Sequence, residues 1–273
     1  MKCPNCGSYV ADGSKYCTEC GTLLNSAQGS RPGSERGVLE SATAGGLAMG
    51  QAARQARMNA SYAPEELISD RAYNGILAGV VLWGLLINAL LCAYVGDVFR
   101  YVNPILFLIL YMVCAFAGIR IASRSRNPVV SFLGYNLLVV PFGLMISTLV
   151  QAYGGLDAQV VRDAFVYTLL ITLGMMATVM IAPNLYQKLG GVLLGCLVGL
   201  LLAEIVLLLF RVDQVVTDWI AAGLFSLYIG YDIYRSQQFP KTVDNAVDSA
   251  LDIYLDIANL FIRLLSILGR RKD

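Results

Sequence analysis

Long apolar runs follow one another through most of this chain and leave few folds open to it. Seven runs, separated by short polar breaks, are each long enough to cross a hydrocarbon core of about 30 Å. They are residues 72–95, 103–121, 129–152, 163–183, 189–210, 215–234 and 246–268. Only 14% of the residues are charged, against about 25% in a soluble domain. Because helices satisfy their own backbone hydrogen bonds in lipid, we expect an all-α polytopic membrane protein with seven transmembrane helices.

Basic residues near the runs predict the orientation of the chain. If the N-terminus is cytoplasmic, most of them lie in inner loops, as the positive-inside rule requires. The inner residues are Arg54, Arg57, Arg71, Arg120, Arg124, Arg126, Lys188, Arg235 and Lys241, and the outer ones are Arg100, Arg162 and Arg211. An odd number of spans also sends Arg270, Arg271 and Lys272 outside, against the rule. Either that tail is exported, or the last run is partly re-entrant.

The first 23 residues carry two CxxC pairs. Their four cysteines are Cys3, Cys6, Cys17 and Cys20. Four thiolates at this spacing are typical of a closed, tetrahedral structural Zn²⁺ site. The alternative is two disulfides in a secreted head, but no apolar segment of the signal-peptide kind precedes these cysteines. The head resembles the small zinc-ribbon domains attached to many prokaryotic membrane proteins, which implies a prokaryotic cell membrane and a head in the cytoplasm.

Residues 24–68 are rich in Ser, Gly and Ala and are typical of a flexible linker. A short helix around Gln51–Met58 is an alternative for part of it. The predicted organisation is therefore a zinc ribbon at 1–23, a linker at 24–68 and a transmembrane domain at 69–273. Three further cysteines, Cys92, Cys114 and Cys196, lie inside apolar runs and are expected to be small buried hydrophobes.

Aspartates recur every four residues in the last apolar run. They are Asp244, Asp248, Asp252 and Asp256. A step of four turns a helix by roughly 400°, so the carboxylates stay near one face with a drift of about 40° per step. A charge at the centre of a bilayer costs about 2.5–3.5 kcal/mol on insertion scales. Such a stripe indicates an ion or proton path, or a buried polar contact between helices.

Asp232 near the end of the sixth run is the predicted partner of Asp256. The short loop between the two runs makes their helices antiparallel neighbours. Asp256 is roughly three turns from that loop and Asp232 only about one, so pairing depends on tilt, on unwinding, or on where the last helix begins. Two carboxylates close together in a low dielectric cannot both ionise, so such a pair would respond to pH. When ionised, it would attract a hard cation such as Ca²⁺.

The other acids have competing interpretations. Asp244 is expected at the N-terminus of the last helix, stabilised by the helix dipole. Asp248 could share that role or belong to an ion path, and Asp252 is undecided. Glu204, the only charged residue in the middle of one of the first five runs, is either a further acid of the path or a partner that holds helices together.

The stretch from Gly230 to Gly269, with LDIYLDIANLFIRLLSILG in its second half, resembles the C-terminal signature of the transmembrane Bax inhibitor motif family. The resemblance implies six helices around a central seventh. It also implies a pH-sensitive calcium leak gated by two aspartates, which fall here on Asp232 and Asp256. The chain departs from the family pattern in its zinc-ribbon head, in Asp248 and Asp252, and in the sequence VPFG at 140–143.

Two classes of function follow. The first is passive, pH-gated cation flux, with Ca²⁺ as the ion. The second is a membrane adaptor that binds a partner protein, such as a membrane protease, through the zinc ribbon and the helix bundle. The chain has no histidine, no HExxH motif and no Walker loop, so we expect neither an enzyme nor nucleic-acid binding. The expected partners are the lipid bilayer and a protein bound by the head, and the sequence leaves the oligomeric state open.

We predict that a peptide of residues 1–25 folds on adding Zn²⁺ and binds one ion, because so short a segment has little core and metal binding supplies its folding free energy. Metal analysis of the purified full chain should find one zinc per molecule. Absence of zinc, or two disulfides found by mass spectrometry, would contradict the site.

Overall fold

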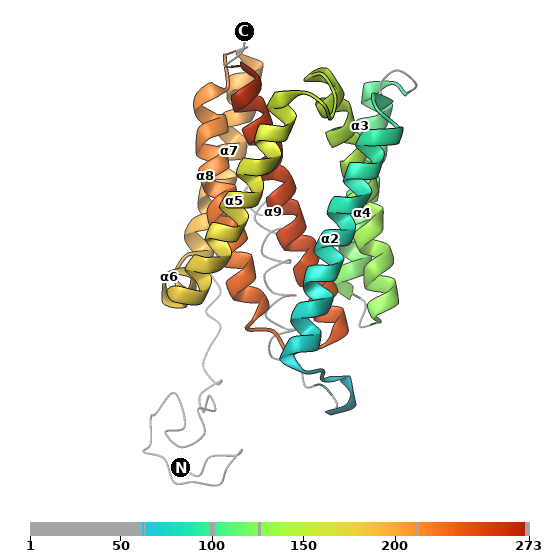
Figure 1. Ribbon diagram of the computed structural model, residues 1–273, viewed down its shortest axis with the longest axis vertical. Coiled ribbons are helices and arrows are strands. Elements are labelled where there is room, and N and C mark those ends of the chain that lie inside the picture. The colour runs from blue at the N-terminus through green and yellow to red at the C-terminus, as the bar shows by residue number, and fades with distance from the viewer. Residues whose placement is uncertain (1–61, 63, 99–101, 125–126, 211, 271–273) are drawn as a thin grey trace, which may run out of the picture. The chain divides into compact units, whose positions relative to one another are not determined.

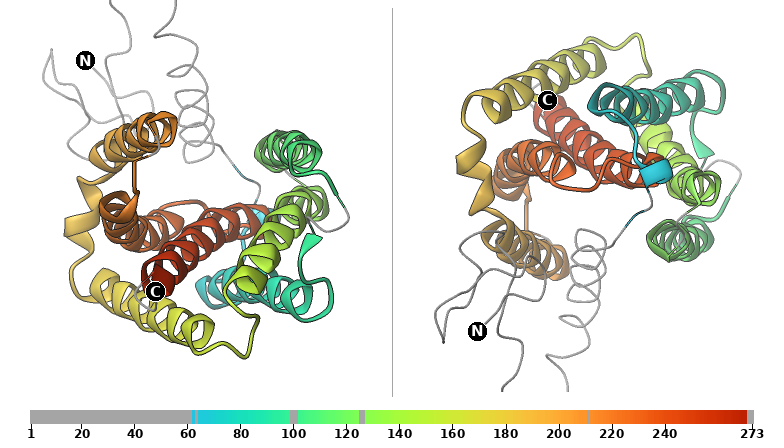
Figure 2. Two further views of the ribbon diagram at one scale, coloured as in Figure 1. Left: turned by 90° about the horizontal axis from the view of Figure 1, so that it is seen from above. Right: turned by 90° about the horizontal axis from the view of Figure 1, so that it is seen from below.

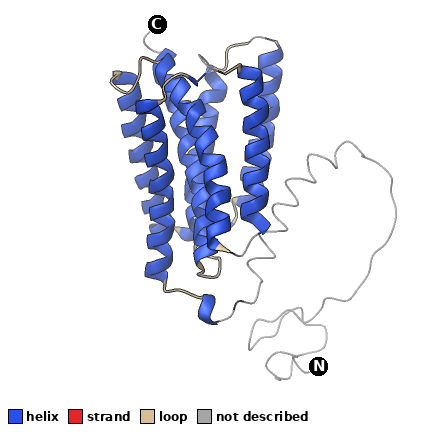
Figure 3. Ribbon diagram, turned by 90° about the vertical axis from the view of Figure 1, so that its right-hand side faces the viewer, coloured by secondary structure: helices blue, strands red, loops and turns tan. Residues whose placement is uncertain are grey.

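The computed structural model describes residues 62, 64–98, 102–124, 127–210 and 212–270. Their regular structure is helical throughout (Figure 3). The elements are η1 (Pro64–Glu66), α2 (Asp70–Tyr94), α3 (Pro104–Arg124), α4 (Pro128–Ala152), α5 (Gln159–Ile181), α6 (Pro183–Gln187), α7 (Gly190–Leu209), α8 (Val215–Ser236) and α9 (Val243–Arg270). The predicted zinc ligands Cys3, Cys6, Cys17 and Cys20, the linker up to residue 61 and the helix suggested at Gln51–Met58 lie outside the described residues.

Each of the seven apolar runs corresponds to one long helix, and local signals explain several of the boundaries. Pro104, Pro128 and Pro183 are the first residues of α3, α4 and α6, a position where the missing N–H of proline costs nothing. The Ser69 side chain accepts a hydrogen bond from Ala72 N at the start of α2. Asn127 caps α4 by accepting one from Val129 N at 3.0 Å. Both caps satisfy donors that a helix leaves open at its N-terminus.

Helix α9 lies in the middle of the bundle (Figure 2). It contacts α2, α4, α5 and α8, and most of its residues are buried, including Tyr254, Leu260 and Leu265 at 0% exposure. It is one continuous helix of 28 residues, so the re-entrant alternative for the last run is wrong. The start of α2 and the end of α9 lie at opposite ends of the bundle (Figure 1).

Five helices are long and apolar enough to cross a membrane: α2, α3 up to Ile121, α4, α5 and α7. Large apolar side chains cover their outer surfaces, among them Leu106, Phe116, Leu170 and Leu202, each 58% exposed or more. Such a surface is compatible with lipid and not with water. The protein is therefore an integral membrane protein that contacts the bilayer with several helices. A crossing by α8 and α9, which are not among the five, stays a prediction.

The expectation that all three intramembrane cysteines are buried is wrong for one of them. Cys92 on α2 is buried, Cys114 on α3 is half-buried, and Cys196 on α7 is exposed. The reason is that lipid and a protein interior are equally apolar, so the sequence of a span does not reveal which face is turned outward.

Helices α2, α4 and α9 approach closely at Gly84. A β-carbon on Gly84 would lie 2.1 Å from the Tyr135 hydroxyl and 2.8 Å from the Tyr254 ring. The Tyr135 hydroxyl donates to Val80 O at 2.8 Å, and the Tyr254 hydroxyl and the Asn88 side-chain amide bond each other at 2.8 and 3.1 Å. Small residues at a helix contact allow this spacing. These contacts hold the side of α9 that faces α2. That side is aromatic, whereas the side that faces α8 carries charged residues.

We predict that Gly84→Ala lowers the stability of the bundle by about 1–3 kcal/mol, because the added methyl group has no space. The matched control is Gly79→Ala on the same helix, where nothing lies within 4 Å of the added carbon. The control should be neutral or slightly stabilising, since alanine favours helix over glycine. Thermal unfolding in detergent measures both, and equal midpoints for the two variants would contradict the close contact.

Candidate functional site

Asp232 and Asp256 meet at the interface of α8 and α9. Both side chains are buried, at 7% and 8% exposure, and the two carboxyl groups are within hydrogen-bonding reach of each other. Asp252 lies one turn before Asp256 on α9. Its carboxylate forms an ion pair with the Arg235 guanidinium at 2.6 Å, and Arg235 also pairs with Asp232 at 3.1 Å. We call Asp232, Asp252, Asp256 and Arg235 the acid group.

Arg235 is held in place from its other side. Its guanidinium carbon lies 5.4 Å from the centre of the Tyr231 ring. Tyr231 in turn packs against the start of α7, where a β-carbon on Gly190 would lie 2.4 Å from its hydroxyl. The single arginine of the acid group thus faces three carboxylates in a fixed position. If all three ionise, the group carries an excess of negative charge.

The point at which α9 begins explains how Asp232 reaches Asp256. Helix α9 starts at Val243, three residues before the predicted run. Asp252 then lies about 13 Å along α9 from that start, yet it contacts Arg235 at the end of α8. The loop of residues 237–242 can span up to about 20 Å, so it lets the first turns of α9 extend beyond the end of α8. Both helices are continuous through these residues, so the pair forms without unwinding of either helix.

The aspartates of the stripe have different neighbours along α9. Asp244 lies in the first turn of α9 and accepts a hydrogen bond from Ser131 of α4 at 2.5 Å. Asp248 is half-buried one turn further on, and Asp252 and Asp256 face α8. A drift of about 40° per four residues turns the stripe by about 120° over this length. The structure therefore brings Asp252 to the Asp232–Asp256 pair and leaves Asp244 against α4, in the helix-start position expected for it.

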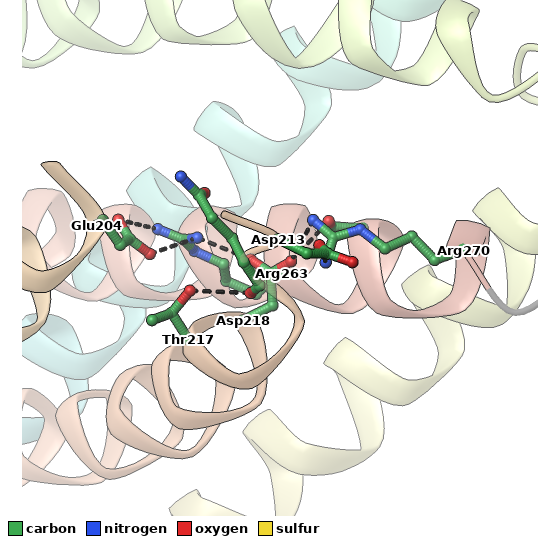
Figure 4. A network of polar contacts seen from close by, with 8 residues as sticks. Glu204, Asp213, Thr217, Asp218, Arg263 and Arg270 are labelled. Carbon is green, nitrogen blue, oxygen red and sulfur yellow. Dashed lines mark hydrogen bonds and ion pairs between the residues drawn. The ribbon is translucent and has the colours of Figure 1, made fainter. Parts of the chain in front are cut away.

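Glu204 does not join the acid group. It lies near the other end of the bundle, where Arg263 of α9 bonds both of its carboxylate oxygens, at 2.7 and 2.9 Å (Figure 4). The same guanidinium donates to Asp218 of α8 at 2.8 Å. Asp218 also pairs with Arg270 at 3.0 Å and accepts a hydrogen bond from Ser266 at 2.9 Å. We call Glu204, Asp218, Arg263 and Arg270 the arginine network.

The loop between α8 and α9 is attached to the start of α2. The Tyr73 hydroxyl donates to Ser236 O at 2.9 Å and lies 3.2 Å from the Ser249 hydroxyl. Ile68 N donates to Lys241 O at 2.8 Å, and the Lys241 amine lies 4.4 Å from the centre of the Tyr73 ring. Burial lowers the pKa of that amine, an effect that Asp70 partly offsets. These contacts connect the residues that follow the linker to the beginning of the aspartate stripe.

Sequence reasoning missed the basic residues of both clusters and the acid Asp218. Arg235 was assigned to an inner loop, yet its spacing of three from Asp232 places both on one face of a helix. Arg263 and Arg270 follow Asp256 at intervals of seven residues, which turn a helix by about 20° less than two full turns. Both spacings were available as signals. Among the described residues, no group of three or more Cys, Asp or Glu side chains is arranged to hold a metal ion.

We predict that Arg235→Gln destabilises the bundle by about 3–5 kcal/mol, because it leaves buried carboxylates without their cation. The loss should be greater at pH 8 than at pH 5, since only ionised carboxylates repel one another once the guanidinium is gone. Thermal unfolding at the two pH values measures both effects. The double variant Arg235→Gln/Asp252→Asn should regain part of the loss, and no recovery would show that Asp252 and Arg235 are not coupled.

Comparisons with known proteins agree with this architecture. A zinc-ribbon domain model matches residues 2–24. A protein of Helicobacter pylori, described as uncharacterized, is 44% identical over 61 residues, which are 22% of this chain and 25% of that protein. The chain thus spans about a quarter of that relative. An uncharacterized protein of Campylobacter jejuni is 30% identical over 127 residues, 46% of this chain and 53% of its own length. One of Borreliella burgdorferi is 25% identical over 234 residues, 77% and 96% of the two chains.

The match that decides the family covers the whole helical bundle. The family model described as inhibitor of apoptosis-promoting Bax1 matches residues 70–273, which include all seven long helices, the acid group and the arginine network. The resemblance drawn from the aspartate signature is thereby confirmed, and the chain belongs to this Bax inhibitor family.

Proposed function

We propose that this protein is a pH-sensitive passive cation channel, with Ca²⁺ as the conducted ion, gated by Asp232 and Asp256. One observation carries the proposal: two carboxyl groups from neighbouring helices lie within hydrogen-bonding reach inside the bundle, at 7% and 8% exposure. Buried acids in membrane helices are costly and commonly mark ion or proton paths. The family assignment supports the same function.

The gate works through the number of protons on the pair. With one proton present, Asp232 and Asp256 share a hydrogen bond, which holds α8 against α9. When that proton leaves, two negative charges face each other across the interface, and the helices are pushed apart. The proton belongs to the set of interacting acids, because Asp252 and Arg235 lie beside the pair. Opening would therefore follow the charge of the whole acid group.

The composition of the acid group suits a hard divalent cation. Three carboxylates face one guanidinium, so full ionisation leaves two uncompensated negative charges. Carboxylate oxygens are the ligands that Ca²⁺ prefers, and the ion accepts irregular coordination. An incomplete set of ligands favours passage over tight binding, because an ion that is held too strongly does not leave. No catalytic activity is part of this proposal.

The orientation belongs to the same proposal: the N-terminus is cytoplasmic and α9 ends on the outer side. The basic C-terminal tail seemed to oppose this orientation. Arg270, however, pairs with Asp218 at 3.0 Å and with Asp213 at 3.3 Å. Its charge is thus offset within the bundle, which weakens its contribution to the positive-inside rule.

A second candidate function is a membrane adaptor that binds a partner protein, such as a membrane protease. The zinc-ribbon match at residues 2–24 favours it, because a closed metal site adds a recognition surface and no chemistry. The contacts of Ile68 and Tyr73 with the α8–α9 loop would connect such a head to the bundle. Calcium flux measured with the full chain and with a chain lacking residues 1–50 separates the two functions. Flux in both chains favours the channel, and no flux in either favours the adaptor.

We predict that proteoliposomes holding the full chain conduct Ca²⁺ with one transition between pH 5 and 8. Asp256→Asn and Asp232→Asn should remove most of this pH dependence, because neither variant can place two charges at the interface. The control is Asp244→Asn, an aspartate of the same helix that bonds Ser131 instead, and it should keep the transition. A flat profile in a conducting wild type, or equal behaviour of all three variants, would contradict the gate.

A further inference from the structure

The interface of α8 and α9 contains two charged layers that differ in composition. On α9, Asp256, Arg263 and Arg270 follow one another at intervals of seven residues, and such intervals keep side chains on nearly one face. On α8, the same interval separates Asp218, Phe225 and Asp232. The helices run antiparallel, so Asp232 meets Asp256 at one level and Asp218 meets Arg263 and Arg270 at another.

An apolar layer separates the two. Phe225 lies midway between Asp218 and Asp232 on α8, about 10 Å from each along the helix. It is buried, and it belongs to the same core as Leu260 of α9, which is fully buried. Ala222, also buried at 6% exposure, lies one turn from Asp218 in the direction of Asp232. A cation moving along this interface would have to pass the acid group, the apolar layer and the arginine network.

The arginine network differs from the acid group in charge and in bonding. Its two buried carboxylates, Glu204 and Asp218, face the two guanidiniums of Arg263 and Arg270, and Arg270 also pairs with the exposed Asp213 at 3.3 Å. Arg263 contacts Glu204 through two nitrogens: Nη2 donates a hydrogen bond to Oε2 at 2.9 Å, and Nη1 forms an ion pair with Oε1 at 2.7 Å. Asp218 is 4% exposed, and its two oxygens are bonded by Arg263, Arg270 and Ser266. Each buried carboxylate of the network is therefore already paired with an arginine.

We propose that the arginine network is a fixed closure of the α7–α8–α9 contact, a second barrier to cations at the end opposite the Asp232–Asp256 pair. Its guanidiniums occupy the buried carboxylates that a cation would otherwise bind, and the Glu204–Arg263–Asp218 bridge holds three helices together. Glu204 then acts as a partner that holds helices and is not part of the ion path. The inference rests on the proposed function only in taking the α8–α9 interface as the path.

Thiol labelling tests the closure without any need for cation flow. The parent is the full chain with Cys92→Ala, Cys114→Ala, Cys196→Ala and Ala222→Cys, reconstituted in vesicles with a membrane-impermeant maleimide on both sides. Peptide mass spectrometry reports labelling at position 222 alone. Adding Arg263→Gln should speed labelling about tenfold or more, since it removes two charge-assisted hydrogen bonds and one ion-pair contact. The matched control Arg162→Gln removes an exposed arginine of α5 and should leave the rate unchanged.

Further variants distinguish the loss of the closure from a failure of the protein to fold. Glu204→Gln keeps both arginines and breaks only the two-nitrogen bridge, so it should speed labelling less than Arg263→Gln. Arg263→Lys keeps the charge without the planar fork and should fall between the parent and Arg263→Gln. Equal labelling of Arg263→Gln and Arg162→Gln would overturn the closure, as would fast labelling of the parent. Faster labelling in a protein that conducts no Ca²⁺ would support the closure and overturn the channel.

Discussion

The need to pair charges inside a lipid-facing bundle determines the arrangement of its last two helices. Helix α9 carries four aspartates and two arginines. Each of these charges would cost a few kcal/mol if it faced lipid, so the helix cannot place them all on the outer surface of the bundle. The charge is accommodated because α9 lies in the centre and turns its charged side toward α8. The apolar helices α3, α5 and α7 then supply much of the surface that meets the bilayer. The central position of α9 is thus a consequence of its charge.

The two sides of α9 are held by different forces. Toward α2 and α4, aromatic and small residues pack closely: the rings of Tyr135 and Tyr254 are 5.8 Å apart, and Gly84 leaves them the space. Such contacts depend on shape and do not change with pH. Toward α8, ion pairs and carboxyl groups form the contact, and their strength depends on protonation and on bound cations. A change of charge would therefore move α9 relative to α8 while its other side stays fixed.

Much of this arrangement could be predicted from the sequence, and what could not has a physical reason. The seven long helices follow from run length, since 20 apolar residues have one favourable structure in lipid. Asp232 and Asp256 could be singled out because a charge within an apolar run needs an explanation. The ion-pair partners of Arg235 and Arg263 could not be assigned from the sequence, since long side chains reach several neighbours. The exposed face of α7, which carries Cys196, could not be predicted either, because lipid and protein interior select the same residues.

The difference between the two charged layers follows from counting charges and not from counting acids. The arginine network and the acid group both contain buried carboxylates and arginine. In the first, the two buried acids meet two arginines at 3.0 Å or less, and the exposed Asp213 adds a pair with Arg270. A balanced buried network holds one geometry, because any displacement leaves a charge without its partner. In the second, Arg235 lies beside three acids. Bound protons or cations must therefore supply the positive charge that the protein does not provide. A layer that is incomplete on its own can change state with its surroundings, and a layer that is complete cannot.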